Sequence, residues 1–299
     1  MKQFIPSVLI SFFILLTSII NAQINGQGTF TQIKYFKSEY VNSRNIDIWL
    51  PIDVSNDKRY TVLYMHDGQM LFDSTNTWNK QEWKVDEVMT KLLNDKKIND
   101  CIVVGIWNDG KYRHADYYPE KSLEFLPDTL KSRLINNDLR GNPNADNYLK
   151  FIVEELKPYI DSVFPTFPDK DHTFIAGSSM GGLISMYAFC EYPNVFGGAA
   201  CISTHWPGSF YNQELIPESF LSYLRKRLPV ADGRKIYFDY GTETIDKYYE
   251  PWQIKVDWIM TEKGYKSDTW ITKVFSGADH SEKSWAARLE IPILFLMGN

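Results

Sequence analysis

A G-x-S-x-G motif at residues 177–181 constrains the fold of this chain most. The apolar run 173–176 predicts a buried strand that leads directly into the motif, and a helix is predicted over 181–191. In so tight a strand-to-helix turn, the two glycines remove side chains that would collide, and the central hydroxyl is exposed at the top of the sheet. We therefore predict that Ser179 is a nucleophile. A glycine-rich turn without a catalytic role is the alternative.

The rest of the chain alternates apolar runs with helical spacing. Strands are also predicted over residues 44–51, 60–65, 101–107, 196–203, 236–240 and 269–275. Further helices are predicted over residues 82–93, 148–163, 220–228, 252–263 and 284–296. This alternation indicates an α/β fold with a mostly parallel central sheet and helices on both faces. We expect residues 44–51 to form an edge strand and residues 23–299 to form a single domain.

The first 22 residues have the pattern of a secretory signal peptide. Lys2 gives a positive start, residues 4–20 are almost wholly apolar, and Ala22 is small enough to precede a cleavage site. An uncleaved membrane anchor is the alternative, because the apolar run is close to the length of a short span. We predict an exported protein, periplasmic or extracellular, with no membrane contact after cleavage.

Composition excludes several functional classes. The formal net charge is −5, from 32 Lys+Arg against 37 Asp+Glu, so binding to nucleic acid is not expected. Cys101, Cys190 and Cys201 have apolar neighbours and are expected to be buried free thiols, with a Cys190–Cys201 bridge as the alternative. We find neither a metal-ligand spacing nor a nucleotide-binding glycine pattern, so no metal and no organic cofactor are expected.

A serine nucleophile needs a general base, and only two histidines follow Ser179. In turns of this type the chain order is serine, acid, histidine. His205 has only Glu191, inside a predicted helix, between it and the serine. His280 lies in the loop after the last predicted strand and is therefore the predicted base. His205 is expected either to line the pocket with Trp206 or simply to pack.

The acid that orients the base should follow the strand over residues 236–240. The candidates are Asp239, Glu243 and Asp246. Asp239 is still within the strand, which favours a structural role. Glu243 and Asp246 both lie in the loop, and the residues alone do not separate them.

Two backbone amides are predicted to stabilise the oxyanion. The N–H of Met180 lies at the start of a helix, where amides point outward. The N–H of Gln69 is the second candidate, in the loop after strand 60–65, where Gly68 is expected to let the backbone approach the substrate. His66 precedes the nucleophile and is expected to be structural.

Residues 108–146 are polar, turn-rich and without a clear period. They lie between a predicted strand and a predicted helix, at the edge of the sheet where α/β proteins bind ligands. We predict a lid or substrate-binding loop there, with surface decoration as the alternative.

Taken together, these motifs resemble those of an esterase family of the α/β-hydrolase fold. That family includes enterochelin-type, feruloyl and acetyl-xylan esterases and S-formylglutathione hydrolases. The resemblance covers residues 38–296. It is carried by S-R at 43–44, W-L-P at 49–51, Y-M-H-D-G-Q at 64–69, G-I at 105–106, Arg113, Y-P at 118–119, F-I-V-E-E-L-K-P at 151–158, the motif at 177–182, Y-G-T at 240–242, Asp246 and G-A-D-H at 277–280.

The resemblance implies a secreted serine esterase with Ser179 as nucleophile and His280 as base. It favours Asp246 over Glu243 as the acid. A small-molecule or glycan ester is the implied substrate, linked to a carbohydrate or a siderophore. Trp107 and Arg113 join His205 and Trp206 as candidate substrate-binding residues. An acyltransferase, a non-catalytic binding module and a peptidase of the same fold remain alternatives.

Overall fold

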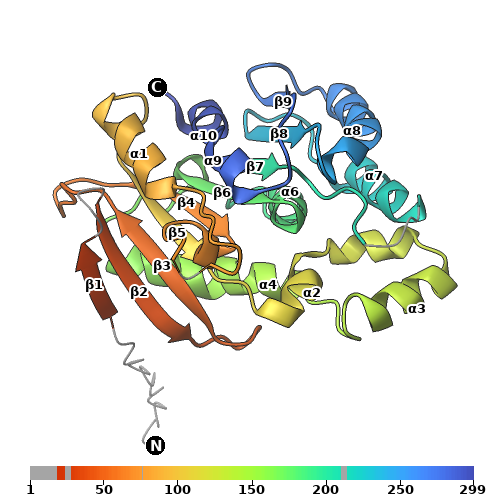
Figure 1. The fold of residues 1–299 in the computed structure, drawn as a ribbon, viewed down its shortest axis with the longest axis horizontal. Coiled ribbons are helices and arrows are strands. Elements are labelled where there is room, and N and C mark those ends of the chain that lie inside the picture. The colour runs from red at the N-terminus through yellow and green to blue at the C-terminus, as the bar shows by residue number, and fades with distance from the viewer. Residues whose placement is uncertain (1–18, 24–27, 76, 210–213) are drawn as a thin grey trace, which may run out of the picture.

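One sheet of nine strands runs through the described part of the chain, residues 19–23, 28–75, 77–209 and 214–299 of a computed structural model (Figure 1). Its strand order is β1-β2-β3-β5-β4-β6-β7-β8-β9. The strands are β1 (Ile19–Gln23), β2 (Thr29–Phe36), β3 (Arg44–Leu50), β4 (Thr61–His66), β5 (Cys101–Ile106), β6 (Thr173–Ser178), β7 (Gly198–Ile202), β8 (Lys235–Gly241) and β9 (Trp270–Phe275).

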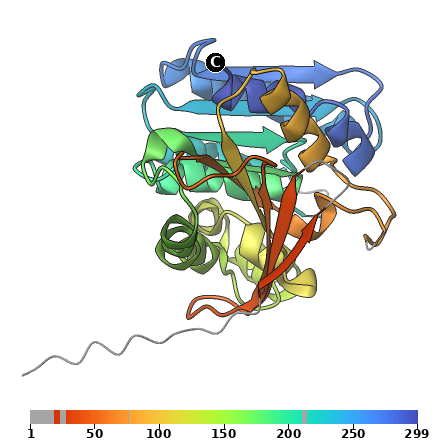
Figure 2. The same ribbon diagram turned by 90° about the vertical axis from the view of Figure 1, so that its left-hand side faces the viewer.

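The sheet is antiparallel at its N-terminal end and parallel elsewhere. β1, β2 and β3 form an antiparallel meander, and β3 pairs antiparallel with β5. All pairings from β5 across to β9 are parallel. The sheet twists, so that β1–β3 run steeply across the direction of β8 and β9 (Figure 2). The predicted α/β class with a mostly parallel sheet is confirmed.

Helices cover both faces of this sheet (Figures 1 and 2). Both faces are apolar, because successive residues of a strand point to opposite sides of the sheet. In β4, Val62 and Tyr64 belong to one apolar core, and Leu63 and Met65 belong to the other. The first core is closed by α2 (Arg113–Tyr117), α3 (Asp128–Asn137), α4 (Ala145–Lys150), α5 (Lys157–Val163), α6 (Met180–Glu191), α7 (Leu215–Arg227) and α8 (Glu250–Glu262). The second is closed by α1 (Val85–Asn94), α9 (Glu282–Ala286) and α10 (Glu290–Met297).

Two predictions about the elements are wrong. Residues 44–51 are not an edge strand, because β2 pairs along the outer side of β3. β2 is rich in β-branched and aromatic residues but lacks the regular alternation of apolar and polar residues on which the strand predictions rest. Residues 108–146 are not one long loop, since α2, α3 and the 3₁₀ helix Glu120–Phe125 lie within them. α2 and the 3₁₀ helix are short, and α3 is largely polar with Leu134 as its buried residue, so none of them has the repeated apolar spacing that a helix prediction needs.

The predicted signal peptide falls mostly outside the described residues, which begin at Ile19. The strand β1 spans the expected cleavage site and pairs with β2. Within the described ranges, no helix has the length and apolar character needed to cross a membrane. The three cysteines are free and buried, as the sequence predicts.

Candidate active site

The candidate catalytic residues meet at the carboxyl ends of the parallel strands. Ser179 follows β6, Asp246 follows β8, and His280 follows β9. Gln69 lies after β4 and Arg113 after β5. Because parallel strands all point the same way, these five residues from distant parts of the chain reach one edge of the sheet.

The turn that carries Ser179 is strained and tightly packed. Ser179 has φ 57° and ψ −120°, a conformation that non-glycine residues rarely adopt. Its backbone N–H donates to the Ile202 carbonyl at 2.9 Å, and its carbonyl accepts from the His205 N–H at 3.1 Å. A Cβ on Gly177 would lie 2.8 Å from the backbone of Gly181, which explains why the turn needs these glycines.

Asp246 and His280 form a partly buried acid–imidazole pair. The distance from His280 Nδ1 to Asp246 Oδ1 is 2.5 Å, and the Asp246 side chain is fully buried. Burial alone would raise the pKa of Asp246, but hydrogen bonds from His280, Ser203 and Gly241 outweigh it and hold that pKa below its usual value. An ionised Asp246 fixes the His280 proton on Nδ1, which leaves Nε2 as the ring nitrogen that can accept a proton.

Ser203 supports this acid, and sequence reasoning missed it. Its Oγ donates to Asp246 Oδ2 at 2.5 Å and accepts from Trp285 Nε1 at 3.0 Å and from Arg288 Nη2 at 2.8 Å. Arg288 also pairs with Asp239, so the charge of that arginine is balanced inside the protein. The only available signal was the position of Ser203 directly after a strand next to β6.

The loop that carries His280 is tied to the loop that carries the acid. The His280 N–H donates to Thr244 Oγ1 at 2.9 Å, and the Ala278 carbonyl accepts from the N–H groups of Thr242 and Glu243. The Glu243 side chain is exposed. The structure therefore brings Asp246, and not Glu243, to His280.

The two predicted oxyanion donors lie at helix starts near Ser179. Met180 is the first residue of α6, and Gln69 lies in the one-turn 3₁₀ helix Gly68–Met70. Amides in the first turn of a helix have no acceptor within that helix. Gly68 is also needed for packing, because a Cβ there would lie 2.6 Å from the backbone of Gly105. It permits packing of this loop on β5.

An ion pair holds the loop after β4 in place. Arg113 donates from Nε and Nη2 to the two carboxylate oxygens of Asp67, each at 2.7 Å, and Asn108 Nδ2 donates to Asp67 Oδ1 at 2.7 Å. Burial pushes the pKa of Asp67 upward, yet Arg113 and Asn108 bring it below its usual value. The guanidinium of Arg113 also lies over the Tyr117 ring.

Several of the candidate site residues line a cavity of about 650 Å³, which we call the Ser179 cavity. Ser179, His280, Gln69 and Arg113 all face it. Its other lining residues are Asp67, Met70, Trp78, Asn79, Gln81, Trp83, Asn108, Gly110, Ser178, Ser281, Glu282 and Trp285.

The other candidate substrate-binding residues lie elsewhere. His205 is buried against the Tyr249 hydroxyl, and Trp206 donates to Gln253 beneath the surface. Neither is among the described residues that line the Ser179 cavity. Trp107 lines a neighbouring cavity.

Comparison with known proteins assigns the family. A family model described as "Putative esterase" matches residues 38–290. The chain belongs to this family. It is the family that the sequence resemblance predicted, and the fold is of the α/β-hydrolase type.

The curated relatives of the chain are distant. It is 25% identical over 171 residues to the uncharacterized protein YjcH of Bacillus subtilis, covering 57% of this chain and 59% of that protein. It is 24% identical over 219 residues to an endo-1,4-beta-xylanase/feruloyl esterase of Xylanibacter ruminicola, covering 70% of this chain and 26% of that protein. The chain thus spans less than two thirds of the length of either relative.

Solved structures share the fold. The enterobactin esterase of Shigella flexneri superposes with a TM-score of 0.65 at 19% identity, over 89% of this chain and 59% of that one. A ferulic acid esterase superposes with a TM-score of 0.63 at 18% identity, over 90% of this chain and 97% of that one.

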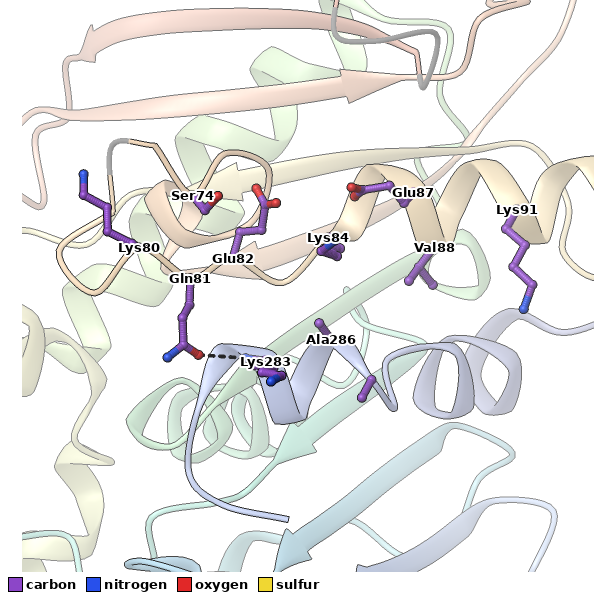
Figure 3. Close-up of a pocket in the computed structure, with 11 residues that line it drawn as sticks. Ser74, Lys80, Gln81, Glu82, Lys84, Glu87, Val88, Lys91, Lys283 and Ala286 are labelled. Carbon is purple, nitrogen blue, oxygen red and sulfur yellow. Dashed lines mark hydrogen bonds between the residues drawn. The ribbon is translucent and has the colours of Figure 1, made fainter.

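A third hollow of about 550 Å³ lies between α1 and α9 and does not belong to the reaction site (Figure 3). Gln81 is the residue it shares with the Ser179 cavity, and its Oε1 accepts from the Lys283 N–H at 3.1 Å. The remaining lining is mostly lysine and glutamate side chains. No histidine is among the described residues that line it.

Proposed function

We propose that the chain is an exported serine esterase that hydrolyses a carboxylic ester through Ser179, His280 and Asp246. One observation carries the proposal. His280, which lies 2.5 Å from the buried Asp246, faces the same cavity as a serine on a strained strand–helix turn. That combination supplies a nucleophile, a base and an orienting acid.

The reaction proceeds in two steps. His280 takes the proton of the Ser179 hydroxyl as the Oγ attacks the ester carbonyl, and the Met180 and Gln69 N–H groups stabilise the oxyanion. His280 then gives that proton to the leaving alkoxide, and an acyl-enzyme remains. In the second step His280 takes a proton from water as the water attacks the acyl-enzyme carbonyl, and then gives that proton to the leaving Ser179 Oγ, which releases the carboxylic acid and the free serine. Asp246 stays ionised and balances the imidazolium in both steps.

The substrate proposal is a carbohydrate-linked or siderophore ester outside the cytoplasm. The apolar residues 4–20 support export. The feruloyl esterase and enterobactin esterase relatives support these two ester classes. An acyltransferase, in which an acceptor alcohol replaces water, is the competing reaction for the same site.

The first experiment is hydrolysis of p-nitrophenyl acetate and methyl ferulate by the mature protein beside Ser179→Ala. We expect turnover that the substitution abolishes, and labelling of Ser179 by a fluorophosphonate. Neither turnover nor labelling would overturn the esterase mechanism and favour a binding module. Labelling without turnover would direct the search to other esters and to acyl acceptors.

A further inference from the structure

A second cavity of about 640 Å³ adjoins the Ser179 cavity. The two cavities share the lining residues Gln69, Met70 and Trp78, so these side chains stand between them. A ligand whose ester lies at Ser179 can therefore extend past this boundary into the second cavity. Apart from Gln69, the residues that line the second cavity have no role in the proposed reaction.

The lining of the second cavity is aromatic and acidic. Four rings face it, those of Phe30, Phe72, Trp78 and Trp107. Trp78 is 84% exposed, which is unusual for an indole and leaves its faces open to a ligand. The charged groups that line it are the carboxylates of Asp47 and Asp73, and no lysine, arginine or histidine is among its described lining residues.

Asp47 organises the polar part of this cavity. Its Oδ1 accepts from Gln32 Nε2 at 2.7 Å, and its Oδ2 accepts from Trp107 Nε1 at 2.5 Å. Asp47 is only 4% exposed, and burial raises its pKa to about 6 even though both hydrogen bonds oppose the shift. The carboxylate thus fixes the Trp107 ring and the Gln32 amide in one orientation before any ligand arrives.

This chemistry selects a class of ligand. Because the charged side chains among the described lining residues are both carboxylates, the cavity disfavours an anionic group such as a ferric catecholate complex. Open indole faces beside fixed amide and carboxylate groups suit a neutral molecule that has both an apolar face and hydroxyl groups. A sugar ring has both, because its C–H bonds form a face and its hydroxyls lie around the rim.

We propose that the second cavity binds the sugar alcohol of a neutral glycosyl ester, which packs against Trp78 and Trp107 and faces the Asp47–Gln32 pair. This inference rests on the proposed esterase reaction and narrows its substrate to the carbohydrate-linked class. The acyl group then occupies the Ser179 cavity, and the sugar leaves from the second cavity when the acyl-enzyme forms.

The test compares esters in two pairs, and within each pair the acyl group is the same and only the alcohol differs. The first pair is methyl ferulate and 5-O-feruloyl arabinose, and the second is the acetyl esters of ethanol and of methyl xyloside. We expect the sugar ester to be preferred about tenfold in kcat/KM, through a lower KM. Trp78→Ala should remove most of this preference, and Trp107→Ala should reduce it. Trp258→Ala is the matched control, an indole 70% exposed on α8 and outside both cavities, and it should keep the preference.

Direct binding to the Ser179→Ala protein separates the two proposals. Calorimetry with methyl arabinoside and methyl xyloside should show binding that Trp78→Ala weakens at least tenfold. Methyl ester hydrolysis without a sugar preference and without sugar binding would overturn the subsite while the esterase stands. Sugar binding that depends on Trp78, without turnover of any ester, would support the subsite and count against the reaction. Tighter binding of a ferric catecholate complex would overturn the sugar assignment.

Discussion

Ser203→Ala tests whether the hydroxyl beneath the acid contributes to catalysis. The side chain is fully buried and is not among the residues that line either cavity, so substrate binding should be unaffected. Its loss leaves Asp246 Oδ2 with the Gly241 N–H at 2.8 Å and removes an acceptor from Trp285 Nε1. Asp246 then holds His280 less firmly.

The magnitude follows from the three bonds that are lost. A hydrogen bond to an ionised carboxylate contributes about 1.5–3 kcal/mol, and a buried N–H left without an acceptor costs about 1–3 kcal/mol. Because such terms are not additive, we expect the free energy of unfolding to fall by about 3 kcal/mol. Looser orientation of the base should lower kcat by about 10- to 100-fold with KM unchanged.

The assay is steady-state hydrolysis of p-nitrophenyl acetate together with urea unfolding. Ser203→Gly separates the hydroxyl from the backbone, because Ser203 has φ 40° and glycine relieves that strain. Both variants should lose similar kcat, whereas Ser203→Gly should lose less stability. Ser219→Ala, which removes a buried hydroxyl from α7, is the matched control and should keep its kcat. A folded Ser203→Ala protein with kcat within twofold of wild type would refute the reasoning.

Three further predictions follow from the site and its surroundings. Asp246→Asn should lower kcat by about 10⁴-fold, since the amide stabilises the wrong imidazole tautomer. Glu243→Gln should keep kcat within twofold of wild type, and steady-state hydrolysis of p-nitrophenyl acetate measures both. His66 and His205 are buried and neutral, and burial lowers the pKa of each to about 3. The unfolded chain therefore takes up protons first as pH falls below about 6.5. In urea unfolding, the free energy of unfolding should fall by about 2 kcal/mol per histidine at pH 5, and His66→Gln should halve the combined loss. A flat profile between pH 7 and 5 would contradict this. Arg113→Gln should cost about 2–4 kcal/mol of stability and lower kcat/KM, because it leaves a mostly buried carboxylate unpaired; loss of less than 1 kcal/mol in thermal unfolding would contradict it.

The elements that carry Ser179, Asp246 and His280 could be predicted because their signals are local. A glycine-flanked serine between strand and helix, and polar loops directly after apolar strands, are visible in a short stretch of sequence. The parallel sheet then brings the strand ends together without further information.

The supporting residues could not be predicted, because their partners are distant in the chain. Arg288 reaches Ser203 across 85 positions. Trp206 and Trp107 occupy similar sequence contexts, each just after a strand, yet one is buried and the other lines a cavity. The direction of such a side chain depends on the packing of neighbouring strands, which no local pattern reports.

Four of the described non-glycine residues with a positive φ lie where the site is built. Asp67, Ser179, Ser203 and Thr244 have φ between 40° and 58° although none is glycine. They follow β4, β6, β7 and β8, which are consecutive neighbours in the sheet. Each such residue costs about 1–2 kcal/mol that glycine would recover.

The side chains explain why glycine does not occupy these four positions. Asp67 pairs with Arg113, and Ser179 is the proposed nucleophile. Ser203 Oγ donates to Asp246, and Thr244 Oγ1 accepts from the His280 N–H. Glycine would relieve the backbone and remove the contact. We therefore expect Thr244→Gly to keep or raise the melting temperature while it lowers kcat, because the His280 loop loses its anchor. Lower stability together with unchanged kcat would show instead that the Thr244 contact serves only the fold.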